Sequence, residues 1–367
     1  MALRILNVAG ARPNFMKIAP IMSALEQRPG MEGLIVHTGQ HYDVAMSEVF
    51  FEELGLPEPE VNLEVGSGDR SEQICRIAER FEPVVRDERP DAVLVVGDVT
   101  STVACAGVAK RHGLPVIHVE AGLRSFDRDM PEEINRIETD QLSDLLFVTE
   151  PSGMANLAAE GVSGRAFLVG NVMIDCLARN LAKARDRGVH ERLGLTAGSY
   201  VVGTFHRPSN VDSPERLANV LRIIEHAAGS GPVVLPLHPR TRASLERHGL
   251  RERLFAVPGL HIVEPLGYLD FISLVDRAAA VVTDSGGIQE ETTWLRVPCI
   301  TMRDNTERPV TVDIGTNVLA GTQPRSVCDA IDAVMAGRGK RGGIPEHWDG
   351  RAAQRIVDVM ARELGGG

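Results

Sequence analysis

The sequence predicts an α/β protein built from two doubly wound parallel sheets. Short runs rich in β-branched residues alternate with stretches of helical spacing in both halves of the chain, which is typical of βαβ units. Clusters of glycine, charged and hydroxyl residues follow these runs, as expected where parallel strands end at a ligand site. The length of 367 residues favours two domains, although a single barrel domain can be as long.

We predict five strands in each half of the chain. Those of the first half are LRILNVAG, LIVHTG, DAVLVVGD, PVIHVEAG and DLLFVTE, and those of the second are YVVGTFH, VVLPLHP, LHIVEP, AAVVTDSGG and PCITMRD. Between the halves, a turn and a charged helical stretch make a plausible crossing from one domain to the next. We therefore expect domains at 1–170 and 171–349, and if the two sheets face each other, the polar clusters line one cleft.

Composition excludes several classes of protein. The formal net charge is -11 and no basic tract opposes it, so no nucleic-acid partner is expected. No apolar run approaches the ~18–20 residues that span a bilayer, and the N-terminal stretch does not resemble a signal peptide, so we expect a cytoplasmic protein without a membrane partner. The five cysteines are scattered without metal-ligand spacing, which argues against a structural metal and a disulfide framework.

A glycine turn at Ser285-Gly286-Gly287 ends one predicted strand and opens a helix. Such a helix start offers unpaired N–H groups and a positive dipole end to a phosphate, whereas the plainer interpretation is an Asp or Ser cap. Glu290 and Glu291 follow about 100° apart on the helix, so they cannot share one task. We expect one to accept hydrogen bonds from hydroxyls, as on a ribose, and the other to lie in solvent or pair elsewhere.

Two cations follow the first strand in GARPNFMKIAP. Arg12 and Lys17 lie near a helix start, where a cation opposes the helix dipole, so contacts to a phosphate are favoured over solvated charges. The glycine there does not belong to a G-x-G-x-x-G run, so the sequence carries little support for a dinucleotide cofactor.

Three carboxylates follow in the first half: Asp98 in GDVTST, Glu120 in HVEAGLRS and Glu132 in MPEEINR. A carboxylate at the end of an apolar strand is costly unless it caps a helix or faces a polar cleft. Asp98 has a helix cap as its alternative role, and Glu132 has a surface ion pair with Arg136 four residues later. Several carboxylates in one pocket raise one another's pKa, which allows an acid and a base to coexist near neutral pH.

Histidines end two strands of the second half. His206 precedes Arg207 in FHRPSNVD, and His238 ends VVLPLHP. A lone histidine in such a place is more often structural, but two beside a phosphate cradle favour contacts to a diphosphate or a sugar.

Seven motifs occur in the order and spacing of one known family: GARPNFMKIAP, GDVTST, HVEAGLRS, MPEEINR, FHRPSNVD, TDSGGIQEE and NTERP. In them the chain resembles the non-hydrolysing UDP-N-acetylglucosamine 2-epimerases, from residue 3 to about residue 320. WDGRAAQRIVDVM resembles the family's closing helix, at about 350–367, which crosses back onto the first domain. The resemblance implies a GT-B fold, a homodimer, a UDP-sugar substrate and a C2 epimerisation that uses no cofactor and no metal.

Residue by residue, the resemblance implies catalytic roles for Asp98, Glu120, Glu132 and His206. It implies substrate binding by Arg12, Lys17, Arg136, Ser285, Gly286, Gly287, Glu291 and Arg308. Glu291 matches the ribose-binding glutamate.

The sequence departs from the family pattern in two places. Arg207-Pro208-Ser209-Asn210 replaces two arginines followed by Glu-Asn, and Asp43 stands where many members have glutamine. These positions belong to a pocket where a second UDP-N-acetylglucosamine activates some members, and they mark Gln40, Arg207 and His238 as allosteric candidates. The departures also leave room for a modified UDP-sugar.

Three other functions are compatible with the sequence. A GT-B glycosyltransferase shares the phosphate cradle but does not need acids on both faces of a sugar. A hydrolysing epimerase differs by releasing UDP, and a non-catalytic UDP-sugar-binding protein does not need the three carboxylates.

Overall fold

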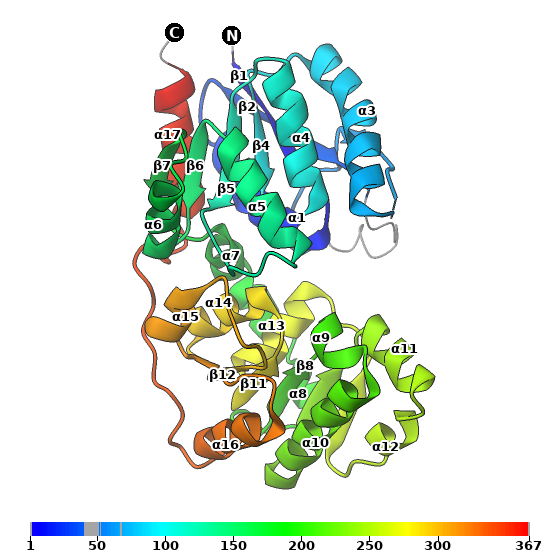
Figure 1. Ribbon diagram of the computed structural model, residues 1–367. Coiled ribbons are helices and arrows are strands. Elements are labelled where there is room, and N and C mark those ends of the chain that lie inside the picture. The colour runs from blue at the N-terminus through cyan, green and yellow to red at the C-terminus, as the bar shows by residue number, and fades with distance from the viewer. Residues whose placement is uncertain (1, 40–50, 52, 67, 366–367) are drawn as a thin grey trace. The chain divides into compact units, whose positions relative to one another are not determined.

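The computed structural model describes residues 2–39, 51, 53–66 and 68–365 of the chain. These form two compact units (Figure 1): the first unit comprises Met1–Arg179 with Glu346–Gly367, and the second comprises Asn180–Pro345. The division falls inside helix α7 (Val172–Asp186), whereas the sequence-based expectation placed it just before that helix.

The first unit is a parallel seven-stranded sheet in the order β3-β2-β1-β4-β5-β6-β7. Neighbouring helices α3, α4 and α5 cover one face, and α1 and α17 pack together on the other (Figure 1). The strands are β1 (Leu3–Ala9), β2 (Met31–His37), β3 (Val61–Asn62), β4 (Ala92–Val96), β5 (Val116–Ala121), β6 (Leu145–Val148) and β7 (Arg165–Leu168). The helices, besides α7, are α1 (Arg12–Glu26), α3 (Arg70–Glu88), α4 (Thr100–Arg111), α5 (Pro131–Leu142), α6 (Pro151–Ala159) and α17 (Ala352–Leu364).

Burial on both faces explains why the central strands are apolar throughout. Every residue of β4 and β5 is buried, and the core on one face joins Leu6 and Val95 to Ile77 and Phe81 of α3. This is the expected pattern for a parallel sheet covered by helices on both sides.

The closing helix α17 is fixed to the first unit by two buried polar contacts. The carboxylate of Asp175 accepts the N–H groups of Ala352 (3.1 Å) and Ala353 (2.7 Å), which lack partners within their own helix. The indole of Trp348 donates to the carbonyl of Thr149 at 3.1 Å. A residue of α7 therefore serves as the cap of a helix that follows it by more than 170 positions.

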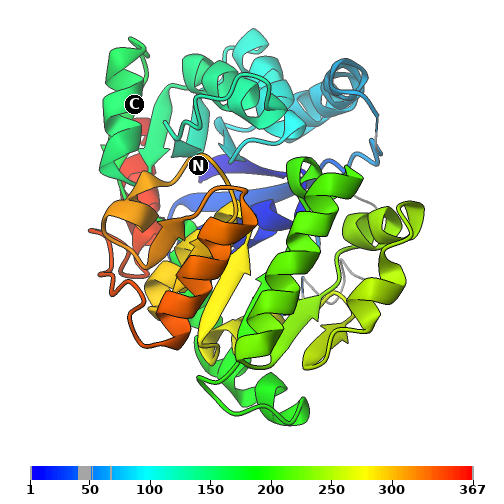
Figure 2. The same cartoon turned by 60° about the horizontal axis from the view of Figure 1, so that its bottom comes forward.

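The second unit is a parallel six-stranded sheet in the order β10-β9-β8-β11-β12-β13. Helices α10 and α16 lie side by side on one face (Figure 2), and α8 and α13 cover the other. The strands are β8 (Val201–Thr204), β9 (Val233–Pro236), β10 (Leu260–Val263), β11 (Ala280–Thr283), β12 (Cys299–Thr301) and β13 (Asn317–Leu319). The helices are α8 (Val189–Arg192), α9 (Pro208–Val211), α10 (Pro214–Ser230), α11 (Pro239–Arg247), α12 (Arg251–Phe255), α13 (Tyr268–Asp276), α14 (Gly286–Leu295), α15 (Pro309–Asp313) and α16 (Pro324–Met335).

Each sheet reverses its strand order once, between β1 and β4 in the first unit and between β8 and β11 in the second. Ligands of open parallel sheets bind beyond the carboxyl ends of the strands at such a point. The predicted site residues Lys17 and Asp98 follow the first pair of strands, and His206 and Ser285 follow the second. Topology therefore places a candidate site in each unit.

Candidate functional site

The strand ends of the first unit are held together by Asn14, in the first turn of α1. Its side-chain oxygen accepts the N–H groups of Gly10 (3.0 Å) and Ala11 (2.8 Å), and its amide donates to the carbonyl of Val96 at 3.1 Å. The loop after β1 is thereby fixed to the end of β4. Arg12 begins α1, but its side chain lies outside the described structure, as does the whole of Gln40.

Lys17 and Glu120 form an ion pair at this edge, with only 6% and 2% of the two residues exposed. The backbone of Glu120 has a left-handed φ of 73°, a conformation that is costly for a residue other than glycine and that often accompanies functional sites. The Lys17 side chain passes over Gly97, where an added Cβ would lie 2.8 Å from its Nζ. The ion pair therefore depends on a glycine directly before Asp98.

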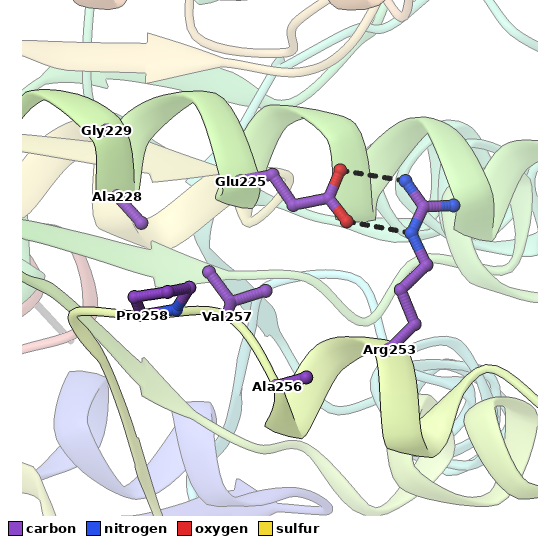
Figure 3. A pocket seen from close by; sticks show the side chains of 7 residues that line it. All are labelled: Glu225, Ala228, Gly229, Arg253, Ala256, Val257 and Pro258. Atoms are coloured by element: carbon purple, nitrogen blue, oxygen red, sulfur yellow. Dashed lines mark hydrogen bonds and ion pairs between the residues drawn. The ribbon is translucent and has the colours of Figure 1, made fainter.

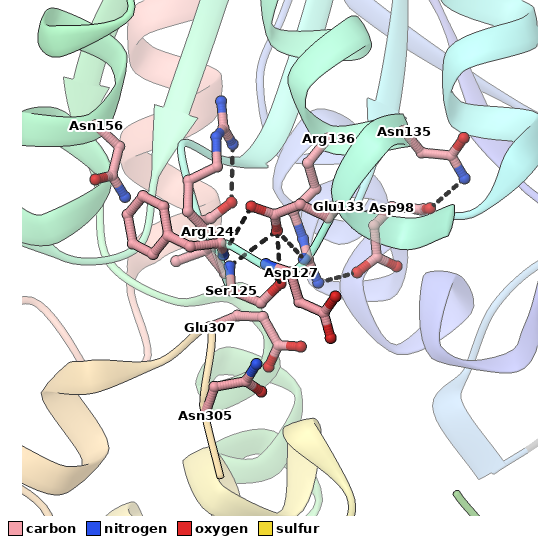
Figure 4. A network of polar contacts seen from close by, with 12 residues as sticks. Asp98, Arg124, Ser125, Asp127, Glu133, Asn135, Arg136, Asn156, Asn305 and Glu307 are labelled. Atoms are coloured by element: carbon pink, nitrogen blue, oxygen red, sulfur yellow. Dashed lines mark hydrogen bonds and ion pairs between the residues drawn. The ribbon is translucent and has the colours of Figure 1, made fainter. Parts of the chain in front are cut away.

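Arg136 connects Asp98 to a second buried carboxylate (Figure 4). Its guanidinium donates to Asp98 and lies 3.3 Å from Oε2 of Glu133. Glu133 in turn accepts the N–H groups of Ser125 (2.8 Å) and Phe126 (3.0 Å), and so fixes the loop before α5.

Two alternatives from the sequence are resolved by these contacts. Val99, not Asp98, is the residue at the cap of α4, and Asp98 instead accepts from Arg136. Arg136 contacts Glu133, three residues before it, while Glu132 lies exposed in the first turn of α5. Sequence spacing alone did not distinguish which of the two adjacent glutamates faces inward.

In the second unit, the buried carboxylate of Asp284 organises the strand ends. It accepts the N–H groups of His206 (3.1 Å) and Arg207 (3.0 Å), the amide of Asn210 (3.2 Å) and lies 2.9 Å from Nδ1 of His206. Burial alone would raise the pKa of Asp284, but His206 and the neighbouring donors hold it below its ordinary value.

His238 packs against His206, with ring centroids 5.2 Å apart, and caps α11 by accepting the N–H of Arg240 at 3.2 Å. Partial burial lowers the pKa of His238, and His206 lowers it further. His238 therefore has a structural role as a helix cap, which is common for a histidine at the end of a strand.

Helix α14 begins with the predicted anion cradle. Ser285 occupies the cap position in an extended conformation, but its side chain makes no capping hydrogen bond in the described structure. The N–H groups of the first turn are thus left for a ligand, which favours the cradle over the plain cap. A Cβ at Gly286 would lie 2.8 Å from Nη1 of Arg308, whereas nothing described lies within 4 Å of a Cβ at Gly287.

Glu290 and Glu291 both lie buried, in different surroundings. Glu290 pairs with Arg308 at 2.7 Å, so the expectation that one glutamate pairs elsewhere holds and neither lies in solvent. Burial raises the pKa of Glu291 to about 8, with a further rise from Glu290 and an opposing hydrogen bond from Tyr268.

Residues that the sequence reasoning missed surround this cradle. Arg303 binds both oxygens of Glu307, at 2.9 and 2.8 Å, and Arg207 and Arg308 each lie 3.6 Å from the same carboxylate. Gln289 accepts from Thr306, at 2.7 Å, and from Asn317. Glu307 stands beside Arg308 in the NTERP motif, which was the available signal.

A pocket of the second unit lies away from the cradle (Figure 3). It is bordered by the end of α10 and by the turn between α12 and β10, with Glu225 and Arg253 paired at 2.7 Å on its wall. Gly229 and Pro258 precede strands β9 and β10, so the pocket lies at the amino ends of the strands, opposite the predicted ligand edge.

Comparison with known proteins identifies the family. A family model described as UDP-N-acetylglucosamine 2-epimerase matches residues 23–361. The chain belongs to this family. The epimerase of this name from Methanocaldococcus jannaschii is 40% identical over 362 residues, which cover 96% of this chain and 97% of that protein. The UDP-2,3-diacetamido-2,3-dideoxy-D-glucuronate 2-epimerase of Pseudomonas aeruginosa is 38% identical and covers 98% and 100%.

Solved structures of UDP-N-acetylglucosamine 2-epimerases share the architecture. That of M. jannaschii with UDP-GlcNAc and UDP has a TM-score of 0.90 and 39% identity, covering 98% of this chain and 99% of that one. That of Neisseria meningitidis with UDP-GlcNAc has a TM-score of 0.89 and 27% identity, covering 98% and 100%. A Phytolacca americana protein solved with UDP-2fluoro-glucose shares the fold alone, at a TM-score of 0.59 and 12% identity. The predicted GT-B fold is confirmed.

None of the helices among the described residues is long and apolar enough to cross a bilayer. No group of three or more histidine, cysteine, aspartate or glutamate side chains in that part of the chain is arranged to hold a metal ion.

Proposed function

We propose that this family member interconverts UDP-N-acetylglucosamine and UDP-N-acetylmannosamine, or a related UDP-2-acetamido sugar, by eliminating and re-adding UDP. The observation that carries the proposal is the pair of cation-bound carboxylates at one sheet edge, Lys17–Glu120 and Arg136–Asp98, with Glu132 exposed on the adjoining helix. Proton transfer at a sugar carbon requires such groups, whereas binding UDP alone does not.

The chemistry explains why more than one carboxylate is required. The hydrogen on C2 is not α to a carbonyl, so its removal must be coupled to loss of UDP from C1. A base takes the C2 proton, the C2–H electrons form the C1=C2 bond of a glycal, and the C1–O electrons leave with UDP. In the return step an acid delivers a proton to the opposite face of C2 and UDP adds back at C1. We assign this proton chemistry to Asp98, Glu120 and Glu132 as a set.

The leaving group needs a different environment. UDP gains charge as it departs, and the free N–H groups at the start of α14 together with Arg308 supply donors and positive charge for its phosphates. His206, oriented by Asp284, supplies a further donor beside this cradle. Glu291 accepts the ribose hydroxyls in this proposal, as the family resemblance implies.

The test is incubation with UDP-N-acetylglucosamine in D2O, followed by NMR of the sugar C2 position and of free UDP. Deuterium at C2 in both epimers, with little free UDP, is the expected result. Accumulating UDP would instead indicate the hydrolysing reaction, and binding without exchange would indicate a different substrate or a binding role.

The relative from P. aeruginosa names a second substrate to test in parallel, UDP-2,3-diacetamido-2,3-dideoxy-D-glucuronate. Both sugars present the same C2 hydrogen and the same UDP leaving group, so the ratio of their kcat/KM values decides between them. An excess for the acidic sugar would place the natural substrate among modified UDP-sugars.

The assembly and the compartment rest on the family resemblance. We propose a cytoplasmic homodimer, in which Gln40, Arg207 and His238 take part in activation by a second UDP-sugar. Light scattering on the purified protein should give twice the chain mass of 39.8 kDa. Hyperbolic kinetics in UDP-N-acetylglucosamine would contradict the activation.

A further inference from the structure

A buried histidine–aspartate pair lies behind the carboxylates of the first unit. His118 on β5 and Asp140 on α5 are both fully buried, and Nδ1 of the histidine lies 2.7 Å from Oδ1 of the aspartate. The other ring nitrogen, Nε2, lies 2.9 Å from the carbonyl oxygen of Gly97. Neither residue belongs to the set that the sequence or the family resemblance assigned to the reaction.

The hydrogen-bond partners determine where the protons reside. A carbonyl oxygen only accepts, so Nε2 must carry a proton to bond to Gly97. The second oxygen of Asp140 receives the N–H of Gly122 at 3.1 Å and the guanidinium of Arg124 at 2.7 Å, both of which favour the ionised carboxylate. An ionised Asp140 only accepts, so Nδ1 also carries a proton and His118 is a buried imidazolium.

The charges around the pair agree with an ionised Asp140 and a His118 ring protonated on both nitrogens. Burial by itself would raise the pKa of Asp140, but His118 and Arg124 lower it below its ordinary value. Arg124 also binds Glu160 at 2.7–2.8 Å, so the two positive charges of His118 and Arg124 face the two carboxylates of Asp140 and Glu160. The buried group of charges is therefore paired throughout, as burial of charge requires.

The pair joins the three segments that carry the predicted acid and base groups. His118 holds the carbonyl of Gly97, directly before Asp98, and itself lies two residues before Glu120. Asp140 holds the N–H of Gly122, two residues after Glu120. Asp140 also belongs to the same helix as Glu132. One doubly protonated ring thus fixes the end of β4, the turn after β5 and helix α5.

We propose that the His118–Asp140 ion pair is a positioning device for the epimerisation. It sets the spacing of Asp98, Glu120 and Glu132. The second proton on the His118 ring allows the hydrogen bonds to the Gly97 carbonyl and to Asp140 to form at the same time. This role rests on the proposed function, because a position matters only if those carboxylates transfer protons. Loss of one ring proton would leave either the Gly97 carbonyl without its donor or Nδ1 facing a carboxylate.

The proton inventory is tested on the wild-type protein without any substrate. Histidine-selective 15N labelling and long-range 1H–15N correlation at pH 7.5 should give, for His118, two nitrogens with the shifts of protonated imidazolium. His118→Gln identifies the His118 resonances because they disappear from the spectrum. If that variant does not fold, Asp140→Asn identifies them by the change in their chemical shifts. An unprotonated nitrogen at His118 would overturn the proposal.

The positioning role is tested by separating kcat from binding. His118→Gln should lower kcat by about 10²-fold, the scale of a small misplacement of reacting groups, with the Kd for UDP changed less than about twofold. The matched control is His226→Gln, which removes a histidine–aspartate contact of 2.8 Å on an exposed surface and should leave both constants unchanged. A kcat close to wild type, or an equal loss of UDP affinity, would contradict the positioning role.

The two failures are distinguishable. If the wild-type protein catalyses C2 hydrogen exchange in none of the UDP-sugars tested, the proposed function fails. The 15N spectrum then still decides whether the charged pair exists. If the wild type exchanges and the spectrum shows a neutral ring, only the positioning device is overturned.

Discussion

The two sheet edges solve different electrostatic problems with similar topology. In the first unit the carboxylates contact cations, as in Lys17–Glu120 and Arg136–Asp98. In the second unit arginines also pair with carboxylates, as in Arg308–Glu290, but they lie around a helix start, and Glu291 lies against another glutamate and a tyrosine. The first edge thus holds its carboxylates in place beside cations, whereas the second combines arginines with the N–H groups of a helix start and so suits negative charge and hydroxyl groups. Substitutions at the first edge should therefore change kcat, and substitutions at the second should change binding.

The largest effect is expected from Asp98→Asn. The variant removes a charge that Arg136 binds directly, and loss of an acid or base group typically costs about 10²–10⁴ in kcat. Epimerisation rates and calorimetric binding of UDP-N-acetylglucosamine measure the two constants separately. Glu138→Gln is the control, since Glu138 lies exposed on α5, the helix that carries Arg136. An Asp98→Asn variant that retains kcat within threefold would contradict a proton-transfer role for Asp98.

A pH effect at Glu291 comes next. Because burial raises the pKa of Glu291 to about 8, the carboxyl is mostly protonated at pH 7, and binding ribose hydroxyls to the ionised form must release a proton. Affinity for UDP-N-acetylglucosamine should therefore rise by up to about tenfold per pH unit below pH 8 and level off above it. Calorimetry between pH 6.5 and 9 measures this, and Glu291→Gln should flatten the profile. If the affinity of Glu291→Gln depends on pH as steeply as that of the wild type, another group releases the proton.

Gly287→Ala should separate stability from binding. A Cβ fits without contact, so the variant should be as stable as wild type or gain up to about 0.5–1 kcal/mol, because alanine favours a helix. The same methyl group obstructs a phosphate, and we expect Kd to rise about tenfold, equivalent to about 1.4 kcal/mol, with kcat at saturation retained. Thermal unfolding measures the change in stability, and calorimetry measures the change in Kd. Gly286→Ala provides the contrast, since its Cβ must displace Arg308.

The smallest effect on activity is expected at Asp175, whose carboxylate caps α17. Burial raises its pKa to about 6 from 3.8, despite the two N–H donors. The folded state therefore holds this proton more tightly than the unfolded state. This contribution to the unfolding free energy should fall by about 2–2.5 kcal/mol as pH rises from 4 to 7, at about 1.4 kcal/mol per pKa unit.

The measurement is urea unfolding followed by Trp348 fluorescence in a Trp294→Phe background, since Trp348 is buried in the first unit. The difference between the wild-type and Asp175→Asn unfolding free energies should show the fall, while kcat and Kd stay unchanged. A difference that is constant from pH 4 to pH 7 would disprove the assignment.

The strands that the sequence did not predict lie at sheet edges, although the partly exposed edge strand β10 was predicted. All ten predicted runs contain strands, whereas β3, β7 and β13 were not predicted, and each of these lies at the edge of its sheet. Edge strands are short and partly exposed, as β3 is with two residues, so their sequences carry little apolar signal.

The site was predictable where chemistry and backbone coincide, as at the glycine turn after β11. It was not predictable where contacts join distant residues. His118 appeared as one polar residue within a strand, because its partner Asp140 lies 22 residues away. The inward position of Glu133 rather than Glu132 depends on the Ser125 loop, which local spacing does not encode.

The most direct test of the division between the edges is C2 hydrogen exchange by Glu120→Gln in D2O, measured at a UDP-N-acetylglucosamine concentration that saturates the variant by calorimetry. We expect the variant to bind the nucleotide sugar with near wild-type affinity and to exchange C2 hydrogen at least about 10²-fold more slowly. Exchange at the wild-type rate with full occupancy would show that proton transfer does not depend on the first edge.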